Sequence, residues 1–174
     1  TKGVVVNFGD FKNYFSNKDD SSSSFNLEYE KWKKDKELDV ISISAAKLNH
    51  SNNFFDILSK TNYHSLMISP RKDVLPSVIK YNQFRYYDFV YNDIDAILSN
   101  NSKLIGFIGH FNYSVATSLY MFASYGIPVI AYDIEPNSII IKDNNIGLTI
   151  PIGCDEIQVN EVINEIQNKY NFYS

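Results

Sequence analysis

The sequence has one cysteine, Cys154, among its 174 residues. One thiol cannot form an intrachain disulfide, so the fold depends on its core, and this scarcity fits a reducing compartment. No apolar run approaches the ~20 residues that a membrane helix needs, and no secretory signal is visible. We therefore expect a cytoplasmic chain that does not span a membrane. Its start at Thr1, without a methionine, favours a piece of a longer protein.

Positive charge is also scarce. Lysine and arginine total 16 against 20 acidic residues, which gives a net charge of −4. Sequence-independent nucleic-acid binding needs an electropositive face, so we expect no nucleic-acid partner. The sequence also lacks the P-loop, G-x-G-x-x-G, H-E-x-x-H and G-x-S-x-G motifs, which disfavours kinases, dehydrogenases, metalloproteases and hydrolases. His50 and His64 are not spaced as metal ligands, so no metal site is expected.

Hydrophobic residues make up 44% of the chain, enough for a core. Apolar runs of strand length alternate with helical segments of ~8–15 residues, which predicts an α/β, Rossmann-like parallel sheet with helices on both faces. Right-handed crossovers place all strand carboxyl ends, and so the site, at one edge. We treat residues 1–174 as one domain, with a flexible loop at 17–24. The expected strands are 3–8, 38–44, 64–69, 86–91, 103–108, 129–131 and 148–150, and the expected helices are 25–37, 52–60, 93–99, 115–124 and 156–170.

Two of the expected helices carry finer predictions. Asn92 is placed to cap the helix at 93–99, because asparagine is a good N-cap residue. In the last helix, the apolar residues are expected to face inward; these are Ile157, Val162, Ile163 and Ile166.

The stretch from Gly109 to Gly147 is the most informative part of the chain. A turn-rich loop leads into an apolar helical run, Gly126-Ile127-Pro128 ends that run, and a buried strand follows at 129–131. Asp133 closes this strand, and a short polar segment then leads to the last strand. A loop that enters a helix beside the end of a parallel strand is where α/β folds hold phosphates.

This stretch resembles the carboxyl-terminal, nucleotide-sugar-binding domain of GT-B glycosyltransferases. Its pattern A-G-x-P-V-I-A, an acidic residue and a later V-x-x-x-x-x-G is similar to residues 123–147 here. Residues 112–130 are most similar to bacterial galactofuranosyltransferase-like and adhesin-glycosylating glucosyltransferases. The matching residues are Ala123, Gly126, Pro128, Val129, Ile130, Ala131, Asp133, Ile141 and Gly147.

The resemblance implies a set of binding residues for a UDP-sugar donor, with no cofactor and no metal. Backbone N–H groups and hydroxyls in residues 112–118 would hold the diphosphate, and His110 lies in the loop at the site edge. The implied nucleotide-sugar-binding residues are Gly9, Lys12, His110, Asn112, Ser114, Thr117, Ser118, Asp133 and Asn137. The catalytic residues are not identified. For the hydroxyl-bearing residues, simple helix capping by Ser114 and packing by Thr117 are alternatives of equal weight.

Two positions depart from the family pattern. Ala116 stands where the family carries a phosphate-binding lysine, a contact worth roughly 1.5–3 kcal/mol. Lys12, Lys47, Arg71 and Lys72 are candidate substitutes for that cation. Ile139 stands where many of these enzymes carry a glutamate that binds ribose.

The lobe can begin at either of two places in the chain. The lobe begins either at Gly3, with Gly9 and Lys12 in the loop after its first strand, or at Leu38, with residues 41–47 as its first strand and loop. We favour Gly3, because it gives a complete count of strands.

The resemblance implies the donor-binding lobe of a bacterial glycosyltransferase that transfers a hexose to a glycan, glycolipid or glycoprotein. A separate amino-terminal lobe would bind the acceptor, which could be membrane-associated. The alternative is a degenerate, non-catalytic partner subunit that uses the fold for protein or acceptor contacts, which Ala116 and Ile139 motivate. A receiver-like module is disfavoured, because no acidic cluster follows the first strand. The sugar, the base and the oligomeric state are open.

Overall fold

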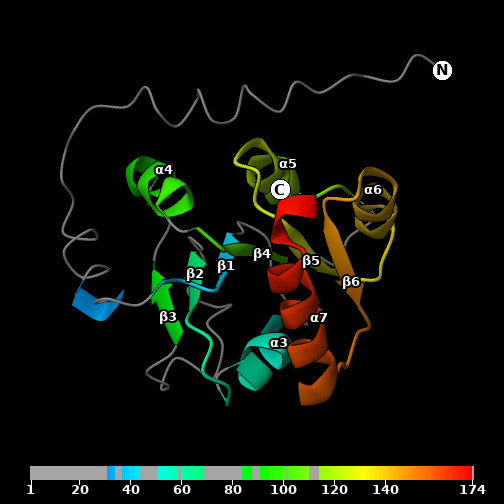
Figure 1. The fold of residues 1–174 in the computed structure, drawn as a ribbon, viewed down its shortest axis with the longest axis horizontal. Coiled ribbons are helices and arrows are strands. Elements are labelled where there is room, and N and C mark those ends of the chain that lie inside the picture. Colours follow the sequence, from blue (N-terminus) through cyan, green and yellow to red (C-terminus); the bar gives the residue numbers. More distant parts are fainter. Residues whose placement is uncertain are drawn as a thin grey trace.

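The computed structural model describes residues 31–33, 37–43, 51–58, 60–68, 84–87, 91–100, 102–109 and 114–173. Its described strands form one sheet, in which every neighbouring pair is parallel (Figure 1). The strands are β1 (Val40–Ile43), β2 (Ser65–Ile68), β3 (Phe84–Tyr87), β4 (Ile105–Ile108), β5 (Val129–Tyr132) and β6 (Gly147–Ile150).

The spatial order of the strands is β3-β2-β1-β4-β5-β6. This is the order of dinucleotide-binding Rossmann sheets, in which the chain winds outward in both directions from the middle. The switch in direction lies between β1 and β4, where Val40 pairs with Ile105. Ligands of such sheets bind in the crevice outside the carboxyl ends of the strands at this switch.

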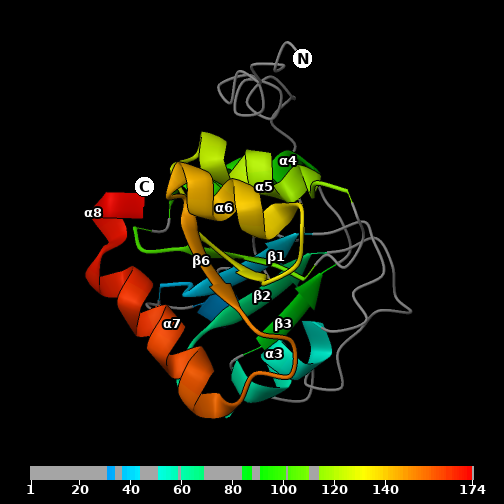
Figure 2. The ribbon, with the colours of Figure 1, turned by 90° about the vertical axis from the view of Figure 1, so that its right-hand side faces the viewer.

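Helices cover both faces of the sheet. One face carries α4, α5 and α6, and the other carries α3 and α7 (Figure 2). This arrangement confirms the predicted fold class. The helices are α3 (Ser51–Leu58), α4 (Tyr91–Ser99), α5 (Thr117–Ser124), α6 (Asn137–Asn144), α7 (Glu156–Asn168) and α8 (Tyr170–Tyr173).

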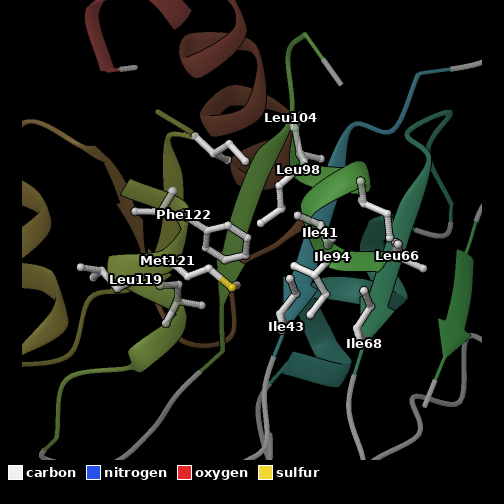
Figure 3. Close-up of a cluster of buried hydrophobic side chains, with 14 of the residues drawn as sticks. Ile41, Ile43, Leu66, Ile68, Ile94, Leu98, Leu104, Leu119, Met121 and Phe122 are labelled. Carbon is white, nitrogen blue, oxygen red and sulfur yellow. The ribbon is translucent and has the colours of Figure 1, made fainter. Parts of the chain in front are cut away.

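The two faces have separate cores, because successive side chains of a strand point to opposite sides. On the α4–α6 face, Ile41 and Ile43 of β1 meet Ile94 of α4, and Phe122 of α5 lies over β4 (Figure 3). Gly106 makes room for Phe122, because a Cβ there would lie 2.4 Å from its ring.

The α3–α7 face is built around aromatic rings. Phe54 of α3 stacks on Phe107 of β4 with ring centroids 4.0 Å apart, and Tyr132 of β5 meets Phe107 edge-on. Val159 and Ile163 of α7 are fully buried against this group.

The sequence missed the helix α6 and the short helix α8, and it misplaced three details. Residues 137–144 form α6, although their polar ends and the Ile139–Ile141 run show no helical period; Asn145 ends the helix in a left-handed conformation, φ 52°. Tyr91 begins α4 instead of ending a strand, so Asn92 lies inside the helix and is not its cap. Ile157 is 67% exposed, and Val159 takes its inward place.

The described part of the sheet is centred on the strand that follows Leu38. The described strands give the Rossmann order with Val40–Ile43 at its centre, and the start of the lobe at Gly3 stays a prediction. The expected strand at 3–8 and the expected loop at 17–24 lie outside the described residues. Residues 31–33 are helical, as expected for part of the 25–37 segment.

Candidate functional site

The carboxyl edge of the sheet brings together the starts of α5 and α6. These helices follow the neighbouring strands β4 and β5 and cover the same face, so both begin at the edge that holds the switch point. The first N–H groups of a helix have no partner inside it, and the helix dipole adds roughly half a positive charge there. This edge can therefore hold an anion.

The first turn of α5 presents hydroxyls as well as backbone N–H groups. Thr117 and Ser114 are exposed, and Ser118 is half-buried. The N-cap residue is Ala116, which makes no side-chain cap. Thr117, at the first helical position, is thus exposed beside the N–H groups.

Asn137 ties the two helix starts together. It is the first residue of α6 and only 2% exposed. Its Oδ1 accepts a hydrogen bond from the Ala116 N–H at 3.0 Å. The asparagine expected to touch the ligand therefore lies buried behind the first turn of α5.

Asp133 lies directly after β5 and is exposed, as expected for a residue that closes the strand. Its N–H donates to the Ile150 carbonyl at 2.9 Å, which anchors the residue beside β6. Its Oδ1 contacts the Lys142 ammonium at 2.7 Å, with both side chains about half exposed. Lys142 is the site residue that sequence reasoning missed, because residues 137–144 do not show the period of a helix.

The departures at 116 and 139 have different structural settings. Ala116 is 5% exposed and packs in the core under α4–α6. A lysine here would have to leave that core or bury its ammonium group, which is energetically costly. Substituting lysine at position 116 would therefore not simply restore the cation of the family pattern. Ile139 is 45% exposed in the first turn of α6.

Gly9, Lys12, His110 and Asn112 lie outside the described residues, as do the alternative cations Lys47, Arg71 and Lys72. Of the implied binding residues, the structure thus brings five to one edge of the sheet; these are Ser114, Thr117, Ser118, Asp133 and Asn137.

The other reactive groups of the described chain offer no competing centre. Cys154 is buried, and burial raises the pKa of its thiol, which keeps it neutral and unreactive. Two open hollows flank α8. They lie at the edge of the sheet where the strands begin, which we call the amino edge, beside residues 102–103 and 126–127 that precede strands. No cluster of three or more His, Cys, Asp or Glu side chains suited to a metal, and no helix able to cross a membrane, occurs in the part of the chain that the structure describes.

Comparison with known proteins identifies the fold. Neither the family models nor the curated protein sequences give a match to this chain. Solved structures do match: WaaG, a glycosyltransferase involved in lipopolysaccharide biosynthesis, aligns with a TM-score of 0.53 and 15% identity over 91% of this chain. The glycosyltransferase SnogD from Streptomyces nogalater aligns with a TM-score of 0.52 and 13% identity over 77% of it.

The chain has a GT-B-like fold. It spans 45% of the length of WaaG and 35% of SnogD, so the likeness covers one lobe of each protein. At these identities the likeness concerns the fold, and the subfamily suggested by residues 112–130 stays a prediction.

Proposed function

We propose that this chain is the donor-binding lobe of a glycosyltransferase and that it binds a UDP-sugar at the carboxyl edge of its sheet. The observation that carries this proposal is the open first turn of α5. It lies at the edge where Rossmann sheets bind nucleotides, its N-cap residue Ala116 has no capping side chain, and Ser114 and Thr117 are exposed beside it. The fold shared with WaaG and SnogD supports the same function.

In this function the α5 turn binds the diphosphate. The Thr117 and Ser118 N–H groups follow the N-cap and point out of the helix start, where they can donate to phosphate oxygens. The helix dipole compensates part of the phosphate charge and would stabilise the diphosphate as it leaves the sugar. We expect neither a metal nor a cofactor in this step.

Asp133 is the candidate residue for binding the hydroxyl groups of the donor. Its carboxylate is exposed at the end of β5, and Lys142 holds it at 2.7 Å without burying it. A carboxylate accepts hydrogen bonds from sugar or ribose hydroxyls, while the paired lysine limits its repulsion of the diphosphate. The acceptor and the catalytic base would come from a second lobe, and the hexose would pass to a glycan, glycolipid or glycoprotein.

Isothermal titration of the chain with UDP, UDP-glucose, UDP-galactose and GDP, first without metal and then with magnesium, tests the proposal. We expect saturable binding of the uridine ligands without metal. Ser114→Ala should weaken this binding by up to about tenfold if its hydroxyl donates to a phosphate. Ser102→Ala is the matched control, because this exposed serine bonds Glu37 at the opposite edge. Absence of any saturable nucleotide binding at millimolar concentration contradicts the proposal.

A second candidate is a non-catalytic lobe that binds a protein. The exposed Ile139 favours it, because an apolar side chain stands at the edge where a ribose-binding carboxylate would be expected. Ile139→Glu separates the two functions, since an exposed position tolerates the change. A donor-binding lobe should gain affinity for UDP, by up to about tenfold for one new hydrogen bond. A protein-binding lobe should show no gain.

A further inference from the structure

We infer that Asn137 is a positioning residue: it sets the phosphate-facing turn of α5 by holding the Ala116 N–H, and it does not touch the nucleotide. This inference rests on the proposed function, because it assigns the role of one residue in the same site. It separates the residues expected at the site into those that face the ligand and one that holds them in place.

The geometry places Asn137 behind the site. Its side chain is 2% exposed, and its Oδ1 is already engaged with the Ala116 N–H at 3.0 Å. A nucleotide reaching this oxygen would have to break a buried hydrogen bond and open the contact between α5 and α6. Thr117, next in the chain after Ala116, is by contrast exposed.

The start of α5 has no anchor from its own cap. Ala116 is the N-cap residue and its methyl group makes no capping bond, whereas α7 carries a full capping box formed by Asp155 and Gln158. The bond from Asn137 crosses 21 residues of sequence and joins the first turns of two helices. Asn137 thus supplies, from the next helix, an anchor that a local cap supplies elsewhere.

The position of this turn matters because phosphate recognition by backbone N–H groups is geometric. Such donors are effective when they are held at about 2.7–3.1 Å from the oxygen before the ligand arrives. If the link to α6 is lost, the first turn of α5 can move, and ordering it again opposes binding. The effect should fall on the diphosphate and spare the nucleoside.

Three variants separate this role from general stability. Asn137→Leu removes the acceptor and keeps the number and branching of the side-chain heavy atoms. Asn137→Asp keeps an acceptor for the Ala116 N–H but adds a negative charge behind the turn. Ile141→Val trims a fully buried side chain on the same helix and serves as the control for lost stability.

Amide-resolved NMR of the whole chain gives the needed readouts: titrations with UDP and with uridine, and the hydrogen exchange of the Ala116 amide. We expect Asn137→Leu to speed Ala116 exchange and to weaken UDP about tenfold, while uridine stays within about twofold. Asn137→Asp should keep the Ala116 amide protected and still weaken UDP more than uridine, because of its charge. Ile141→Val should change neither affinity, although urea unfolding shows it to be less stable.

The outcomes distinguish this inference from the proposed function. A wild-type chain that shows no UDP-dependent shifts overturns the proposed function, and with it the role of Asn137 toward a phosphate. If UDP binds, equal Ala116 exchange in wild type and Asn137→Leu overturns the inference alone. Equal losses of UDP and uridine affinity in Asn137→Leu also overturn it, because they indicate general disruption of the lobe.

Discussion

The two edges of the sheet differ in how many of their polar groups are exposed. At the amino edge, they bond to one another: Asp39 Oδ2 accepts from the His64 N–H at 2.6 Å, and the Tyr170 hydroxyl donates to the Leu104 carbonyl at 2.9 Å. Burial raises the pKa of Tyr170 to about 12, so this hydroxyl stays a donor throughout the neutral range. These bonds join strand starts to the segments that enter or cover them.

At the carboxyl edge, the first turn of α5 is left open. Its cap residue has no capping side chain, and Thr117 beside it is exposed. Asn137 holds the turn from behind and leaves its outer surface to a ligand. The comparison suggests that changes at the amino edge lower stability, whereas changes on the outer surface of this turn alter binding.

The largest effect should come from glycine at the amino end of β6. A Cβ at Gly147 would lie 1.9 Å from the Val129 carbonyl oxygen, and its φ of 156° disfavours other residues. Since the clash is with backbone that pairs β5 to β6, Gly147→Ala should lower the free energy of unfolding by about 3 kcal/mol or more. Urea unfolding followed by circular dichroism measures this loss.

Gly153, beyond the carboxyl end of β6, is the matched control. It has a φ of 76°, but no described atom lies within 4 Å of an added Cβ. Gly153→Ala should therefore show only backbone strain, roughly 1–2 kcal/mol. Equal losses in the two variants would show that the close approach at Gly147 is not the dominant constraint.

A capping variant of α7 should have an intermediate effect and should leave the site intact. Asp155 Oδ1 accepts from the Gln158 N–H at 2.9 Å, and Gln158 Oε1 accepts from the Asp155 N–H at 3.0 Å. Asp155→Ala removes this reciprocal cap and should reduce stability by about 1 kcal/mol. UDP affinity should be unchanged, because this helix covers the other face. Glu161→Gln, an exposed change on the same helix, is the control.

The amino-edge carboxyl should make stability depend on pH. Burial raises the pKa of Asp39, and Glu37 adds to this, against the lowering by the His64 N–H and ring. A raised pKa in the folded state means that the contribution is fully present below the ordinary carboxyl pKa of about 4 and is lost as pH rises through the folded value. The free energy of unfolding of the wild type minus that of Asp39→Asn, which keeps an acceptor for His64, should thus be larger at pH 4 than at pH 7. A stability difference that is the same at both pH values would contradict this prediction.

The smallest effect on stability should come from the exposed turn of α5. Thr117→Ala should change the free energy of unfolding by less than about 0.5 kcal/mol, yet weaken UDP binding several-fold if its first turn holds the diphosphate. Thr61→Ala at the amino edge is the counterpart, because its Oγ1 donates to the Leu58 carbonyl at 2.6 Å. It should reduce stability by about 1 kcal/mol and leave UDP affinity unchanged. If both variants alter UDP binding equally, the expected difference between the two edges is wrong.

Much of the fold could be read from local pattern. The apolar runs at 38–44, 64–69 and 103–108 each contain an observed strand, and the run at 129–131 lies within β5, because buried parallel strands are near-continuous apolar runs. The alternation of these runs with helices was enough to predict the fold class. The α6 helix could not be found in this way, because two of its three buried residues, Asn137 and Ser138, are polar.

The sequence by itself determined the α/β class, because this follows from local periodicity, and the handedness of crossovers predicts one edge for the ligand. The choice of Ser114, Thr117 and Asp133 as candidates came from the resemblance to GT-B glycosyltransferases. Only the tertiary structure decided which strand is central, that Ala116 belongs to the core and that Asn137 lies buried behind α5. These features depend on contacts between segments far apart in the chain. Local residue pattern carries no signal for a side chain that caps the helix of another segment.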